Sequence, residues 1–121
     1  MKNILVVDDN NSFLLGFSMN LCIHLKDCNV LTADNGGKAL EIMRSLPVDC
    51  IVTGLEMPSM NGYELVESIR KKHPALPVYV MTGAGRPEME KKLASLGASR
   101  CVAKPLVFKD LLLGSRAQLA L

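Results

Sequence analysis

The sequence predicts an α/β protein whose parallel β-sheet is covered by helices on both faces. Short runs of apolar, often β-branched residues alternate with longer segments of helical spacing, in five successive units. No repeat, linker or low-complexity tract interrupts these units. We therefore expect one domain over residues 1–121, wound by right-handed crossovers. In such a domain the functional site lies beyond the carboxyl ends of the strands.

The first unit begins with a strand at Ile4–Val7, an uninterrupted apolar run that is typical of a strand buried on both faces. The spacing that follows predicts a helix from about Ser12 to Leu25, with Asn11 or Ser12 as its N-cap. Apolar side chains recur four residues apart on one stripe of this helix: Phe13, Phe17, Leu21 and Leu25.

The second unit begins with a strand at Val30–Ala33 and a turn at Asp34–Gly37, in which Asn35 is placed to cap the next helix. Pro47 is expected to end that helix. Five residues supply its apolar face: Ala39, Leu40, Ile42, Met43 and Leu46.

The third unit has a strand at Cys50–Thr53 and a helix that ends before His73 and Pro74. The apolar face of this helix carries Tyr63, Leu65, Val66 and Ile69. The fourth strand is expected at Val78–Met81, followed by the loop Thr82–Gly85.

Pro87 suits the first turn of the fourth helix, and Gly97 is a good helix stop. The apolar positions of this helix are Met89, Leu93 and Leu96. A fifth short strand is expected at Cys101–Ala103, and a last helix from about Phe108 toward Ala120.

The composition argues against several classes of protein. The formal charge of +2 is too small to predict direct nucleic-acid binding. The dense basic run Arg70–His73 stands at an expected helix end, where it complements the helix dipole. The uncharged run Asn10–Leu25 contains polar residues and is shorter than the roughly 20 apolar residues that cross a bilayer. We expect a cytoplasmic protein without a membrane segment.

The four cysteines form no CxxC pair, and the two histidines stand far apart in the sequence. Buried thiols without a disulfide or metal are therefore expected at all four positions. These positions are Cys22, Cys28, Cys50 and Cys101.

Polar residues gather where the expected strands end. The pair Asp8–Asp9 follows the first strand, and Gly54 and Glu56 follow the third. Thr82 follows the fourth strand, and Lys104 follows the fifth. Because the carboxyl ends of parallel strands meet at one edge of a sheet, we expect these residues to lie on one rim.

Together these pieces resemble the receiver domain of two-component response regulators over essentially the whole chain. The matching segments are ILVVDDN from residue 4, TADNGGKAL from residue 32, DCIVTGLEMPSMNG from residue 49, PVYVMTGAG from residue 77, LGAS from residue 96 and AKP from residue 103. The resemblance implies a flavodoxin-like fold, a three-layer α/β/α sandwich with five parallel strands in the order 2-1-3-4-5.

In that family an aspartate at the end of the third strand accepts a phosphoryl group from a histidine kinase, and its position here is Gly54. The resemblance assigns Asp8 and Asp9 to the acidic pair that holds Mg²⁺, a cation that prefers oxygen ligands. It places the backbone carbonyl of Glu56 near that metal, and it assigns Thr82 as the switch hydroxyl and Lys104 as the phosphate-binding lysine.

Two residues depart from the family pattern. Gly54 has no side chain, so it can neither accept a phosphoryl group nor bind a metal. Cys101 stands where receivers carry the aromatic ring that reports the switch. We therefore expect a degenerate receiver that is not an enzyme and requires no cofactor. Any Mg²⁺ site at Asp8, Asp9 and Glu56 is expected to be weak or vestigial.

The expected function is protein–protein interaction through the face of the fourth helix, fifth strand and fifth helix, about Arg86 to Ala120. Expected partners are a histidine kinase or another receiver, with a homodimer as a further option. One alternative is a Mg²⁺-dependent phosphoryl acceptor that uses another residue, such as Glu56, or an engineered receiver in which Gly54 replaces aspartate. Another alternative is a sensor of small anions beside Lys104 and Thr82.

Overall fold

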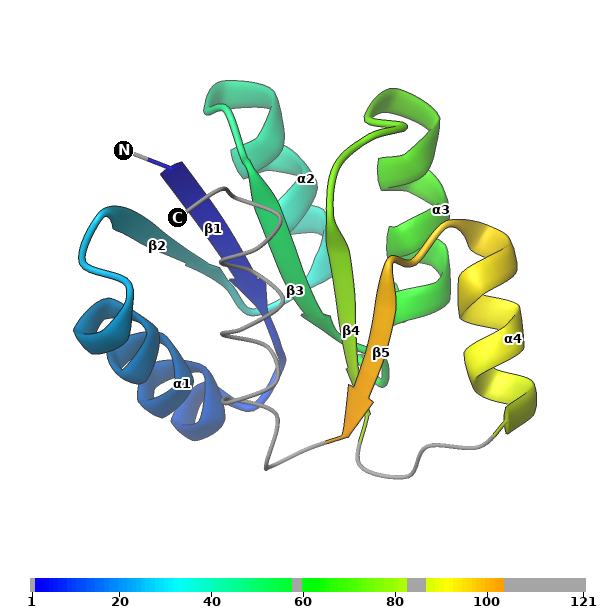
Figure 1. Ribbon diagram of the computed structural model, residues 1–121, viewed down its shortest axis with the longest axis horizontal. Helices are drawn as coiled ribbons and strands as arrows, with labels where there is room; N and C mark the ends of the chain where they lie inside the picture. The colour runs from blue at the N-terminus through cyan, green and yellow to red at the C-terminus, as the bar shows by residue number, and fades with distance from the viewer. Residues whose placement is uncertain (1, 58–59, 83–86, 104–121) are drawn as a thin grey trace.

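The structure is a computed structural model that describes residues 2–57, 60–82 and 87–103. Its sheet is parallel throughout, with the strand order β2-β1-β3-β4-β5 (Figure 1). The strands are β1 (Lys2–Val7), β2 (Cys28–Ala33), β3 (Cys50–Gly54), β4 (Val78–Thr82) and β5 (Arg100–Ala103). The predicted α/β architecture with a parallel sheet is confirmed.

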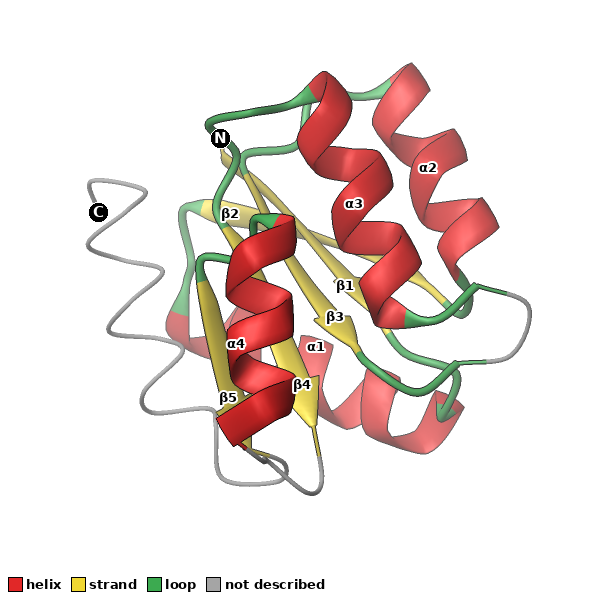
Figure 2. Cartoon of the chain, turned by 90° about the vertical axis from the view of Figure 1, so that its right-hand side faces the viewer, coloured by secondary structure: helices red, strands yellow, loops and turns green. Residues whose placement is uncertain are grey.

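Helices cover both faces of this sheet. The described helices are α1 (Asn11–His24), α2 (Gly36–Ser45), α3 (Gly62–Lys72) and α4 (Pro87–Leu96). Figure 2 shows α2, α3 and α4 on the near face of the sheet and α1 behind it. Within the described part of the chain, no helix is long and apolar enough to cross a membrane. The predicted last helix, Phe108 to Ala120, lies outside the described residues.

The alternation of side chains along β1 divides the core into two clusters. Ile4 and Val6 face α1 and pack with Leu21. Leu5 and Val7 face the opposite way and pack with residues of α3 such as Leu65. All of these side chains are buried, as expected for a central strand of a parallel sheet.

The N-caps of the helices refine the predicted boundaries. Asn10, rather than Asn11 or Ser12, caps α1, because its side-chain Oδ1 accepts a hydrogen bond from the Phe13 N–H at 3.0 Å. The predicted cap of α2 is confirmed, since the Oδ1 atom of Asn35 accepts a hydrogen bond from the Lys38 N–H at 2.9 Å.

Gly97 ends α4 as predicted. Its φ of +110° is a conformation that side chains with a Cβ rarely adopt. The Gly97 carbonyl oxygen accepts a hydrogen bond from Nε of Arg70, at 3.0 Å, which ties the end of α4 to α3.

Two predictions about buried side chains are wrong. Leu46 is 45% exposed, because it is the C-cap of α2 and its extended backbone carries the side chain away from the helical face. Cys22 is exposed, because it lies on the outer side of α1, one position after Leu21, which faces the core. Cys28 and Cys50 are buried, as predicted.

The outer side of α1 is also apolar, which the single predicted stripe did not anticipate. Leu15, Met19 and Ile23 are spaced four residues apart and are 64%, 56% and 61% exposed. The helix contains no Asp, Glu, Lys or Arg. It is therefore a helix with one apolar face on the sheet and a second apolar face on the surface.

Candidate functional site

The strands β1, β3 and β4 end at the same edge of the sheet, the lower edge in Figure 1. Asp8 follows β1, Gly54 is the last residue of β3, and Thr82 is the last residue of β4. Thr82 is buried, with 3% of its surface exposed. The parallel register thus brings three of the predicted site residues to one rim.

Asp8 is held in place at this rim from two directions. Its backbone N–H donates to the Ala33 carbonyl oxygen at the end of β2, at 3.1 Å. Its Oδ1 atom accepts a hydrogen bond from the Asn10 N–H, at 2.9 Å, just before α1 begins. The residue is only 1% exposed. Its carboxylate therefore has a defined position inside the rim.

The Asp8 carboxylate lies directly beside Gly54. An ideal Cβ on Gly54 would be 2.9 Å from Oδ2 of Asp8 and 3.4 Å from its Cγ. The shorter distance is below ordinary van der Waals contact, so any side chain at position 54 requires Asp8 to move. In this protein the Asp8 carboxylate approaches the space that an acceptor side chain would need.

The backbone around Gly54 is well ordered by hydrogen bonds. The Thr53 hydroxyl donates to the Gly54 carbonyl oxygen at 2.9 Å, and Thr53 itself is fully buried. The Leu55 N–H donates to the Met81 carbonyl oxygen at 3.1 Å. The Thr53 side chain is therefore held in the interior, which is consistent with the alternation of side chains along a strand.

The start of α3 packs closely against this segment. The Gly62 N–H donates to the Leu55 carbonyl oxygen at 2.7 Å. A Cβ on Gly62 would lie 2.7 Å from Cα of Leu55 and 2.8 Å from the Gly54 carbonyl oxygen. Since both neighbours are backbone atoms, a glycine at position 62 is required for this approach.

Asp9 and Glu56 are exposed, and both line an open groove of about 460 Å³ beside the rim. Asn61, Tyr63 and Met89 form other parts of its wall. The groove therefore joins the loops after β1 and β3 to the helices α3 and α4.

Sequence reasoning assigned Tyr63 and Met89 to the apolar faces of helices and missed their place in the groove wall. It also missed Lys92, whose Nζ lies 4.4 Å from the centre of the Tyr63 ring. Tyr63 and Met89 are both half-buried. The position of Tyr63 just after the loop that follows β3 was the one sign in the sequence that it lies near the rim. Met89 and Lys92 could not be placed beside it, because residue spacing does not predict which side chains of α3 and α4 come into contact.

The structure does not describe the side chains of two predicted site residues. Lys104 lies outside the described residues. Cys101 belongs to β5, paired with Val80, but the conformation of its side chain lies outside the described part. The roles of both residues remain predictions.

The oxygen donors at the rim do not fit the magnesium site that the family resemblance implies, in which the carboxylate of the acceptor aspartate joins the acidic pair. Position 54 supplies no side-chain oxygen, and its missing side chain would meet the Asp8 carboxylate. Within residues 2–57, 60–82 and 87–103, no three His, Cys, Asp or Glu side chains are grouped so that they could hold a metal ion. No chemical step is assigned to a metal here.

Comparison with known proteins agrees with the parallel fold described above. The family model of the response regulator receiver domain matches residues 4–114. A cyclic di-GMP phosphodiesterase of Thermotoga maritima is 32% identical over 103 residues, which are 85% of this chain and 27% of that protein. The chain thus spans about a quarter of the length of that curated relative.

Two solved structures are similar over their whole length. The signal receiver domain of the DNA-binding response regulator merR from Colwellia psychrerythraea has a TM-score of 0.92 at 23% identity, covering 100% of both chains. This likeness supports the fold alone. The BeF3-activated DrrB receiver domain has a TM-score of 0.88 at 26% identity, covering 100% of this chain and 99% of that one.

Proposed function

The chain belongs to the response regulator receiver domain family of two-component signalling, and from this premise we propose that it acts through protein–protein contact without aspartyl phosphorylation. Receiver domains interact with histidine kinases and other proteins in phosphorelays. The proposed difference is that this domain presents one conformation to its partner instead of switching between two. It performs no catalysis of its own in this proposal.

Gly54 is the observation that carries the proposal. The residue ends β3 where the family has its acceptor aspartate, and it offers no atom that can attack a phosphoryl donor. The Asp8 carboxylate lies 2.9 Å from the position that a Cβ would take. Magnesium binding by Asp8, Asp9 and Glu56 is accordingly proposed to be weak or vestigial, because the acceptor carboxylate is absent.

The proposed partner surface is the face of α4, β5 and the segment that follows, about Arg86 to Ala120. Only part of that face is described, namely α4 and the backbone of β5. A second feature that favours a protein partner is the outer stripe of α1, where Leu15, Met19 and Ile23 are exposed. Exposed apolar stripes of this kind are typical of protein interaction sites.

A second candidate function is phosphoryl acceptance at Glu56, the acidic residue closest in sequence to Gly54. Its carboxylate is exposed, and it lines the same groove as Asp9. A phosphoryl group accepted at Glu56 would restore signalling through a different residue. The geometry disfavours this candidate, because Glu56 stands two residues beyond the end of β3 and reaction geometry tolerates only about 1 Å of misplacement.

Beryllofluoride with Mg²⁺ tests the proposal, since it mimics a phosphoryl group by bonding to an acceptor carboxylate. Amide NMR spectra of the chain and of Gly54→Asp would be recorded with and without it. We expect shifts at the rim and in α4 only for Gly54→Asp. Saturable shifts in the unaltered chain would mean that another carboxylate serves as acceptor, and spectra of Glu56→Gln would then identify it.

A further inference from the structure

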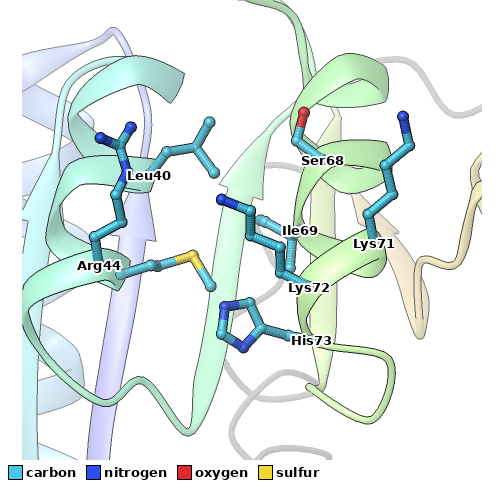
Figure 3. Close-up of a pocket in the computed structure, with 8 residues that line it drawn as sticks. Leu40, Arg44, Ser68, Ile69, Lys71, Lys72 and His73 are labelled. Carbon is cyan, nitrogen blue, oxygen red and sulfur yellow. The ribbon is translucent and has the colours of Figure 1, made fainter.

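A groove lies between the last turns of α2 and α3, as Figure 3 shows. Its floor is apolar and consists of Leu40 and Met43 from α2 and Ile69 from α3. Its volume is about 260 Å³. Because α2 and α3 run back toward the starts of β3 and β4, the groove lies at the opposite edge of the sheet from Gly54.

Basic residues line the groove beside the apolar floor. Arg44 comes from α2, and Lys71, Lys72 and His73 come from the end of α3. In Figure 3, Lys72 and His73 extend toward α2, whereas the ammonium group of Lys71 points away from the groove. None of the residues that line the groove is acidic. The groove therefore combines an apolar floor with basic side chains along its edges.

Helix dipoles explain only part of this arrangement. Basic residues in the last turn of α2 and of α3 each offset the partial negative charge of a helix end. Lys71 also lies 4.0 Å from Glu67, one turn earlier. These explanations treat each helix separately. They give no reason for Lys72 and His73 to extend over the apolar floor toward α2, where Arg44 lines the other side.

We propose that this groove binds an acidic peptide segment of a partner protein, with one large apolar side chain on the floor and flanking carboxylates against Arg44 and Lys72. The volume supports a single anchoring side chain, because pockets for drug-sized ligands measure roughly 300–1,000 Å³. The basic residues that line the groove favour a peptide with acidic residues on either side of the apolar anchor. A nucleic-acid partner fits less well, since its affinity depends on many phosphate contacts.

This inference goes beyond the proposed function, because the groove and the rim lie at opposite edges of the sheet. Binding at the groove does not depend on whether any residue at the Gly54 edge of the sheet accepts a phosphoryl group. The two proposals can therefore fail separately, and a peptide bound between α2 and α3 says nothing about phosphoryl transfer. In the cell the groove would add a second contact to a partner held elsewhere on the domain.

A tryptophan-centred pentapeptide with two glutamates on each side provides the probe. The chain contains no tryptophan, so the emission of the peptide reports directly on burial of its indole ring. We expect a saturable blue shift with a Kd below about 1 mM. Charge reversal by Lys72→Glu or Arg44→Glu should weaken binding about tenfold or more. Lys26→Glu, the same change at an exposed position between α1 and β2, should leave the Kd within about twofold.

Amide NMR of the complex locates the bound peptide. Shifts concentrated at residues 40–44 and 68–73 support the proposal. The proposal is overturned by shifts centred on α1, by no saturable signal, or by equal affinity for a peptide in which glutamines replace the glutamates. Indole-3-acetate that binds as tightly as the peptide would also overturn it, because the site would then select a small anion.

Discussion

At the scale of single residues, the position of the Asp8 carboxylate is compatible with glycine at position 54 and not with a larger residue. The Asp8 carboxylate is buried and fixed by the Asn10 N–H, and it lies within 2.9 Å of the missing Cβ of Gly54. A second carboxylate there would stand beside a buried carboxylate of the same charge. The present rim is therefore arranged for a residue without a side chain.

Gly54→Asp should lower the melting temperature in the absence of divalent cations, because two adjacent carboxylates repel each other. Mg²⁺ should recover much of that loss in the variant and change the unaltered chain little, since it binds the pair of carboxylates. Thermal unfolding with and without Mg²⁺ measures both effects. Gly54→Ala serves as the control for crowding alone, and a Mg²⁺ response in that variant would refute the electrostatic explanation.

Asn10 gives a second prediction at this scale. Asn10→Ala removes the side-chain acceptor of the Phe13 N–H and should lower the free energy of unfolding by about 1 kcal/mol. Asn11→Ala is the matched control, because Asn11 is the first residue inside α1 and should cost little. Chemical denaturation compares the two, and an equal loss in both would show that the cap is misassigned.

At the scale of elements, the close approach of α3 to the end of β3 requires glycine at position 62. Gly62→Ala places a Cβ within 2.8 Å of two backbone atoms, which cannot move without shifting the helix. It should lower the free energy of unfolding by about 1–3 kcal/mol. Gly16→Ala, within α1, meets nothing within 4 Å and should instead raise it by about 0.5–1 kcal/mol. Losses of similar size in both variants would contradict this account.

The two faces of α1 should respond differently to substitution. Ile23→Gln alters the exposed stripe and should change the free energy of unfolding by less than about 0.5 kcal/mol. Leu21→Ala removes a fully buried side chain and should cost about 2–5 kcal/mol. Denaturant titration of the two variants tests this contrast. A large loss for Ile23→Gln would show that the outer stripe is covered in solution.

The sequence predicted the elements well where the apolar pattern decides the structure. The strands at β1, β3 and β4 were found because buried strands are continuous apolar runs. The second apolar face of α1 was missed, because periodicity identifies a buried stripe and does not reveal that the opposite side is apolar without being covered. Leu46 was misplaced because helical periodicity was continued one residue past the end of α2.

At the scale of the whole molecule, the parallel sheet separates two places of possible function. The rim at the carboxyl ends of the strands holds Asp8, Gly54 and Thr82, and the fold rule for parallel sheets predicted their convergence. The basic groove at the opposite edge was not predicted. Arg44 and Lys72 are 28 positions apart in the sequence, and only the packing of α2 beside α3 brings them together.

The phosphorylation state of the whole chain is the most direct test of the account. Intact-mass spectrometry would follow incubation with a small-molecule phosphodonor and Mg²⁺, for the chain and for Gly54→Asp in parallel. We predict that the chain keeps its mass while Gly54→Asp gains one phosphoryl group. A phosphoryl group on the unaltered chain, at Glu56 or elsewhere, would contradict the claim that it works without phosphorylation.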